Sequence, residues 1–312
     1  MKFFILSFIS ILFFGCTNSD KKIDLNDYNR LITQTKSLIA KKSYKNAIIK
    51  CDEALEITDT LSEAFLYKGI SLMHLNKYEE AIDAFDYAID IEGETSTIFK
   101  NKAFANLQLN NYDDFFDDIN TYIKHHKNDS ESYLARGDYY SIEKKYENAI
   151  QDYTTCLKFK PRNSIAILKR ATVYSKIGNN KSGIIDYTNY LKLKSKDSNV
   201  KIYFERGRLF LKEKSFSNAL KDFSKTNYVQ SYRLMGDCYS ILGDTNKALV
   251  FYTKYLHHDS NNSEILKKRS LLYSKLGDIN KSNVDLEKGN KIDWHSKGFF
   301  NKYKYWFLFL VV

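Results

Sequence analysis

The chain has 312 residues, of which 43% are hydrophobic and 28% are charged, with a formal net charge of +10 at pH 7. This composition excludes a disordered or fibrous chain and indicates a folded body with a sizeable core. The basic balance leaves nucleic acid, anionic lipid or an acidic protein open as partners. Lysines occur in all parts of the sequence, which favours a solvated, lysine-rich exterior.

The first fifteen residues have the features of an export signal. Lys2 carries a positive charge, residues 3–14 are almost entirely apolar, and Gly15–Cys16 precedes a polar stretch. The apolar run is too short to span a bilayer as a mature helix. We therefore expect residues 1–15 to be a signal peptide, and export argues against nucleic acid as a partner.

Gly15–Cys16 resembles the cleavage motif of bacterial lipoproteins, with Phe13 and Phe14 where that motif usually has leucine and a small residue. The resemblance implies cleavage before Cys16, acylation of this cysteine, and a lipid-anchored position at a membrane surface of the bacterial cell envelope. We expect the outer membrane, on either its periplasmic or its surface face, and residues 16–27 as the lipidated cysteine and a short tether. An ordinary secreted protein and a cytoplasmic protein with an apolar start are the alternatives.

The rest of the chain contains an internal repeat of about 34 residues, which is typical of helix-turn-helix arrays. A small residue lets two antiparallel helices cross closely, and apolar residues recur at helical spacing without strand-like alternation. The sequence therefore predicts an all-α fold. In four segments a glycine stands twelve positions before an alanine: Gly69 and Ala81, Gly137 and Ala149, Gly207 and Ala219, and Gly236 and Ala248.

Aligned on the small residues, the segment 28–296 divides into eight units: 28–61, 62–95, 96–129, 130–163, 164–197, 200–228, 229–262 and 263–296. They resemble the tetratricopeptide repeat family, whose pattern is small at position 8, aromatic near 11 and 17, alanine at 20, aromatic at 24 and small at 27. The resemblance implies an α-solenoid. The fourth unit matches most fully, through Gly137, Tyr140, Tyr146, Ala149, Tyr153, Cys156 and Pro161.

Turns and departures from the pattern give further expectations. The sixth unit lacks about five residues between Phe223 and Gly236, which predicts a shorter second helix or turn. Residues 297–312 form an apolar tail or cap that packs on the last unit, contacts a partner or membrane surface, or reflects a truncated reading frame. Turns are expected at pairs that tolerate left-handed backbone, namely Asn76–Lys77, Asn110–Asn111, Gly178–Asn179, Gly243–Asp244 and Gly277–Asp278.

No constellation for catalysis, metal or cofactor binding stands out in the sequence. The paired histidines His125–His126 and His257–His258 have no third ligand at a metal-binding spacing. Cys51, Cys156 and Cys238 lie three units apart, so that we expect small buried side chains rather than disulfides. We expect a protein that is not an enzyme, with no cofactor and no metal site.

In the tetratricopeptide repeat family the first helix of each unit lines an inner groove through positions 2, 5, 9, 12 and 13. The resemblance implies a peptide laid along this groove, which is more apolar in its N-terminal half and more charged in its C-terminal half. Ile70 and Phe104 are the stronger candidates for exposed contacts, whereas Leu66 could instead pack between units. The partner-binding residues implied are Lys36, Leu66, Ile70, Lys100, Phe104, Asp138, Arg208 and Arg233.

The function implied is a non-catalytic, membrane-anchored scaffold or adaptor that binds partner proteins or peptides. The carboxylate clamp of chaperone-binding repeats is absent from the first three units, where Ile32 and Lys36, Tyr67, and Thr97 and Asn101 stand instead. The alternative is a ligand-binding lipoprotein for glycans or cell-wall fragments. A purely structural spacer is also open.

Overall fold

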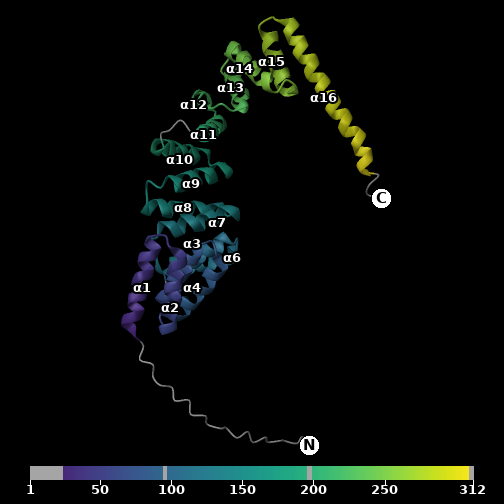
Figure 1. Cartoon of the computed structure of the whole chain (residues 1–312). Helices are drawn as coiled ribbons and strands as arrows, with labels where there is room; N and C mark the ends of the chain where they lie inside the picture. The colour runs from purple at the N-terminus through teal and green to yellow at the C-terminus, as the bar shows by residue number, and fades with distance from the viewer. Residues whose placement is uncertain (1–23, 94–96, 195–198, 309–312) are drawn as a thin grey trace, which may run out of the picture. The chain divides into compact units, whose positions relative to one another are not determined.

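The computed structural model describes residues 24–93, 97–194 and 199–308, with side chains described to residue 294. These residues form sixteen α-helices and no strand (Figure 1), which confirms the predicted all-α solenoid. The signal peptide, Cys16 and the tether to residue 23 lie outside the described residues. The helices are α1 (Leu25–Ala40), α2 (Tyr44–Ile57), α3 (Ser62–His74), α4 (Tyr78–Glu92), α5 (Ile98–Gln108), α6 (Tyr112–His125), α7 (Ser130–Ile142), α8 (Tyr146–Phe159), α9 (Ser164–Lys176), α10 (Asn180–Leu193), α11 (Val200–Lys212), α12 (Phe216–Phe223), α13 (Val229–Ile241), α14 (Thr245–His258), α15 (Ser263–Lys275) and α16 (Ile279–Leu308).

The chain forms two compact units, Met1–Lys127 with α1–α6 and Asn128–Val312 with α7–α16. In each unit an odd-numbered helix packs on the next even-numbered helix, and each pair packs on the following pair. Odd-numbered helices also contact one another, as α3 does with α1 and α5, and α7 with α9. Within each unit they therefore form one layer, the inner layer, and the even-numbered helices form the other. No helix in the described ranges is long and apolar enough to cross a membrane.

In the four repeats with glycine at position 8, this glycine lies against the aromatic residue sixteen positions later. A Cβ atom on Gly69 would lie 2.5 Å from the ring of Phe85, and one on Gly236 would lie 2.5 Å from the ring of Tyr252. Both rings are buried. The two helices of a pair can approach this closely only because the glycine has no side chain, which confirms the predicted role of the small residue.

The turns inside the helix pairs use left-handed backbone, as predicted. Gly178, Gly243 and Gly277 have φ of 77°, 81° and 77°. Lys144 and Lys214 adopt φ of 58° and 56° at two corresponding turns, which the sequence does not predict because lysine has no preference for this conformation. The shorter sixth unit is also confirmed, since α12 has only eight residues.

A partly buried arginine joins the two helices of a pair at position 7, immediately before the small residue. Arg206 on α11 donates from Nε and Nη2 to the two carboxylate oxygens of Asp222 on α12, both at 2.7 Å. The Asp222 side chain is only 2% exposed. Such a bidentate pair fixes both distance and orientation. It recurs in four helix pairs, as Arg136–Asp152, Arg170–Asp186, Arg206–Asp222 and Arg269–Asp285.

The same arginine also joins successive helix pairs. Arg206 Nη1 donates to Thr188 Oγ1 on the preceding α10 at 2.9 Å, and Arg269 Nη1 donates to Thr253 Oγ1 on α14 at 3.0 Å. In the first unit a lysine at position 7 reaches the same place by an ion pair, since Lys68 lies 2.7 Å from Asp52. A position-7 cation therefore stabilises both the pair and the stack.

The pair α13–α14 replaces this ion pair by apolar residues. Met235 and Phe251 occupy the positions that correspond to Arg206 and Asp222, and Met235 is buried. Replacing both partners of a buried ion pair with well-packed apolar residues is often neutral or stabilising, whereas removing one partner leaves a buried charge without compensation.

The natural Met235–Phe251 pair predicts what happens when Arg206 and Asp222 are replaced by the same two residue types. Arg206→Met should lower the stability by about 3–5 kcal/mol because Asp222 stays buried without its partner. The double variant Arg206→Met/Asp222→Phe should recover most of that loss, as read from urea denaturation midpoints of the full chain. Arg208→Met is the control, because Arg208 is exposed and should cost less than about 1 kcal/mol. A double variant as unstable as the single one would contradict this account.

Asp118 in the first unit has no arginine partner, and its burial has a consequence for pH dependence. Its carboxylate accepts a hydrogen bond from Asn106 Nδ2 at 2.9 Å, and Lys102 Nζ lies 3.8 Å away. Burial raises the pKa of Asp118 from 3.8 to about 6, although Lys102 and Asn106 oppose this shift.

The sign of the pH effect follows from the raised pKa. The folded state binds the Asp118 proton more tightly than the unfolded state, so this stabilisation is full below about pH 4 and is lost as the pH rises through about 6. Asp118→Asn cannot titrate there. Its stability relative to wild type should therefore increase from pH 4 to pH 7, by on the order of 2–3 kcal/mol. A difference in urea midpoint that stays constant over this range would refute the assignment.

Candidate binding groove

Two cavities open on the inner layer of the second unit. The first has a volume of about 500 Å³ and lies mainly between α9 and α11. Four cations and one carboxylate surround it, so we call it the basic cavity. The lining residues that define it are Leu168, Lys176, Lys201, Glu205, Arg208 and Lys212.

The second cavity has a volume of about 560 Å³ and is bounded by α11, α13 and α15, with contributions from Phe216 at the start of α12 and Tyr252 on α14. Ile241 and Leu271 line the same cavity and are 62% and 65% exposed, so that both offer apolar surface to it. We call it the apolar cavity. Its apolar lining consists of Leu211, Phe216, Ile241, Leu271 and Leu272, with Lys268 and Lys275 among its polar residues.

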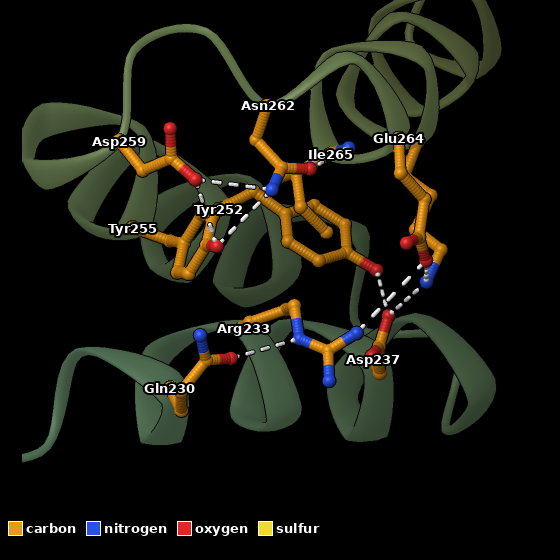
Figure 2. Close-up of polar contacts among 10 residues, drawn as sticks. Gln230, Arg233, Asp237, Tyr252, Tyr255, Asp259, Asn262, Glu264 and Ile265 are labelled. Carbon is orange, nitrogen blue, oxygen red and sulfur yellow. Dashed lines mark hydrogen bonds and ion pairs between the residues drawn. The ribbon is translucent and has the colours of Figure 1, made fainter. Parts of the chain in front are cut away.

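Asp237 lies in the wall of the apolar cavity and is held by a polar network (Figure 2). It accepts a hydrogen bond from Tyr252 Oη at 2.8 Å and another from Lys268 Nζ at 2.9 Å. Lys268 also pairs with Glu264 and lowers the pKa of that carboxyl group. Burial and the neighbouring Asp237 raise the pKa of Tyr252, so its hydroxyl stays a donor. Asp237 is therefore held by one neutral donor and by an ammonium that it shares with Glu264.

The same arrangement occurs at Asp138, one of the predicted groove residues. Tyr153 Oη donates to one carboxylate oxygen at 2.8 Å, and Lys169 Nζ donates to the other at 2.8 Å. Asp138 thus joins α7, α8 and α9. It does not belong to the lining of either cavity, and its role in binding stays a prediction.

Arg208 and Arg233 are the other predicted groove residues of the second unit. Arg208 lines the basic cavity and pairs with Glu205 at 3.2 Å. Arg233 Nε donates to Gln230 at 3.2 Å, and Arg233 Nη1 lies 4.0 Å from Glu264, at the edge of the network in Figure 2. Only Arg208 is therefore part of a cavity.

The predicted residues of the first unit do not converge on one site. Leu66 and Ile70 are half-buried and pack against the hydrophobic core formed by α3, α4 and α5. Lys36 pairs with Glu63 at 3.1 Å, and Lys100 Nζ lies 6.0 Å from the ring centroid of Phe104. The contacts of Leu66 with this core favour a role in packing between helices. Their role in binding stays a prediction.

Sequence reasoning missed the residues that give both cavities their character. Lys201 is at position 2, Lys212 and Ile241 are at position 13, and Leu271 is at position 9 of its unit. The prediction selected residues at positions 5 and 9 alone. Extending it to positions 2 and 13, on the same face of the first helix, would have found Lys201, Lys212 and Ile241. Leu271 stands at position 9 but was not among the residues selected.

The net charge is not evenly distributed along the chain, although lysines occur in every part of the sequence. Residues 24–127 contain 18 acidic and 12 basic side chains, whereas residues 128–312 contain 19 acidic and 33 basic ones. The segments thus differ in net charge, −6 against +14. The asymmetry has two sources, because acidic residues are denser in the first segment and basic residues are denser in the second.

The cysteines and histidines occupy structural positions. Cys51, Cys156 and Cys238 are buried and free, as expected, and burial raises the pKa of Cys51 and Cys238 to about 12. His126 stacks on Tyr122, with ring centroids 4.2 Å apart. In the described ranges no three histidine, cysteine or acidic side chains are grouped to hold a metal ion.

Comparison with known proteins identifies the repeat. The family model described as "Tetratricopeptide repeat" matches residues 130–163. A tetratricopeptide repeat protein from Parabacteroides merdae has a similar structure, with a TM-score of 0.52 and 18% identity over 79% of this chain and 99% of that one. The C-terminal part of a repeat-containing protein from Cytophaga hutchinsonii gives 0.54 and 19% over 73% of this chain and 93% of that one.

YrrB, described as a tetratricopeptide repeat protein with an unusual peptide-binding site, gives a TM-score of 0.50 and 17% identity, covering 55% of this chain and 89% of its own. No curated protein matches the sequence. At these identities the similarities concern the fold. Residues 130–163 are therefore a tetratricopeptide repeat, and the fold of the chain is that of the tetratricopeptide repeat solenoids.

Proposed function

We propose that the protein is a non-catalytic scaffold that binds a partner protein through the inner layer of its second unit. The observation that carries this proposal is the presence of two cavities on one layer of helices, with α11 in the wall of both. A basic cavity beside an apolar one offers a protein segment both orientation by charge and burial of a side chain. The peptide-binding site named for YrrB, which shares the fold, supports the same use of the fold.

The aromatic residues favour a protein ligand over the alternative of glycans or cell-wall fragments. A sugar-binding platform needs open ring faces, but the rings of the tyrosines at position 11 are already covered by cationic side chains in cation–π contacts. The Arg170 guanidinium lies 5.9 Å from the Tyr174 ring centroid, and that of Arg269 lies 5.7 Å from Tyr273. These rings stabilise the position-7 arginines.

A membrane anchor at Cys16 completes the proposal. The motif Gly15–Cys16 at the end of the apolar segment supports acylation of this cysteine, which would hold the scaffold at a membrane surface in the bacterial envelope. Cys16→Ala should abolish incorporation of labelled palmitate and release the protein from the membrane fraction. Unchanged membrane association without label in either protein would contradict lipidation.

Partner capture tests the location of the binding surface. Leu271→Glu places a charge in the apolar cavity and should reduce the partner recovered from cross-linked, detergent-solubilised membranes at least tenfold, because buried apolar anchors dominate binding energy. Ile185→Glu is the matched control, since Ile185 on α10 is 60% exposed and lies outside the cavities.

Two further variants address the first unit. Ile70→Glu and Phe104→Glu should leave the recovered partner unchanged if the second unit binds it. Loss of the partner in these variants, with no effect of Leu271→Glu and with all proteins folded, would move the binding surface to the first unit.

A further inference from the structure

The chemistry of the two cavities identifies the class of ligand. Resting on the proposed function, we propose that the groove binds an extended acidic peptide that places one large apolar side chain in the apolar cavity and its carboxylates in the basic cavity. The segment would cross α11, which lies between the two cavities.

The basic cavity has more positive charge than its own carboxylate can neutralise. Arg208 forms an ion pair with Glu205, and Lys176 Nζ lies 5.6 Å from the centroid of the Tyr146 ring. Lys201 and Lys212 are exposed and form no ion pair with any described residue. Cations held together without counter-charges attract an anion, and the cavity walls strengthen this attraction by excluding water.

The apolar cavity complements the basic cavity by offering apolar surface to one bulky side chain. Ile241 and Leu271 keep more than half of their surface exposed, and Phe216 and Leu211 adjoin them. Asp237 does not repel an acidic ligand strongly, because Tyr252 and Lys268 already bind it. Lys275 adds another positive charge to the same cavity.

The position of α11 sets the spacing of the ligand groups. Leu211 lines the apolar cavity, while Arg208 and Lys212 on the same helix line the basic one. Packed helices lie about 8–10 Å apart, so the centres of the two cavities are roughly 12–15 Å apart, one and a half helix spacings. An extended chain covers this distance in about four residues.

A peptide fits this surface better than a bilayer does. The cavities lie between helices, where a chain can enter and a planar membrane cannot follow the surface. The charge of +14 on residues 128–312 would nevertheless attract anionic lipid, so anionic vesicles belong in the test.

The test uses the full chain and fluorescent synthetic peptides that carry one tryptophan, a spacer of four Gly/Ser residues and three glutamates. Matched peptides carry three glutamines or three lysines, and another replaces tryptophan with serine. Fluorescence anisotropy should show the glutamate peptide binding at least tenfold more tightly than the glutamine peptide, with a smaller ratio at high salt. Removing the tryptophan should cost at least tenfold.

Protein variants locate the binding and control for net charge. Lys201→Glu/Lys212→Glu should remove the preference for glutamate and leave the glutamine peptide unaffected. Lys181→Glu/Lys192→Glu changes the net charge equally at exposed positions of α10 outside both cavities and should change binding less than twofold. Leu271→Glu, but not Ile185→Glu, should weaken both peptides. Circular dichroism confirms that each variant is folded.

The outcomes separate this inference from the proposed function. Equal binding of the glutamate and glutamine peptides, weakened by Leu271→Glu, would overturn the acidic ligand and keep the groove. If both double-lysine variants lose affinity for the glutamate peptide equally, the assignment of its carboxylates to the basic cavity is overturned. Absence of peptide binding, together with binding to vesicles of phosphatidylglycerol that Lys201→Glu/Lys212→Glu abolishes, would overturn both and assign the surface to a membrane.

Discussion

The cation at position 7 of the repeat is the interaction on which the second unit depends most. In four helix pairs it is an arginine that binds an aspartate of its own pair with two hydrogen bonds, and in three of them it also donates to a threonine of the preceding pair. Burying this guanidinium is acceptable only because every contact is matched in charge and geometry. The small residue that follows (glycine, alanine or serine) lets the helices approach, and the arginine fixes how they are aligned.

This arrangement also determines which face of the inner helices is free. Each residue of a helix is rotated by about 100° from the last, so positions 2, 9 and 13 lie roughly 200–240° around the helix from position 7. When position 7 faces the outer layer, these positions form a stripe on the opposite side. Lys201, Arg208 and Lys212 occupy this stripe on α11. The buried ion pair and the basic cavity are thus two sides of the same helix.

Much of the fold could be predicted from the sequence, because its determinants are local and repeated. The period, the small residues and the glycine turns lie within one unit and were sufficient for helix pairs and for the short α12. The Arg206–Asp222 pair was missed because its members are sixteen residues apart and neither belongs to the pattern of small and aromatic residues. The pair is also absent from one unit of the repeat, where Met235 and Phe251 occupy the same positions, so it does not recur regularly in the sequence.

The candidate site was less predictable, because a position on the inner layer does not decide whether a side chain packs or stays exposed. Leu66 and Leu271 are both leucines on inner helices, yet Leu66 is half-buried against a core and Leu271 is 65% exposed. Asp138 has the charge of a binding residue but is bound by Tyr153 and Lys169. Burial and pairing of this kind depend on neighbouring repeats and need the structure.

Hydrogen exchange of the full chain with and without its captured partner tests the central claim most directly, namely that the inner layer of the second unit is the binding surface. We expect slower exchange on binding in α9, α11, α13 and α15, with α10 and α14 little changed. Protection confined to the even-numbered helices, or to α1–α6, would contradict it.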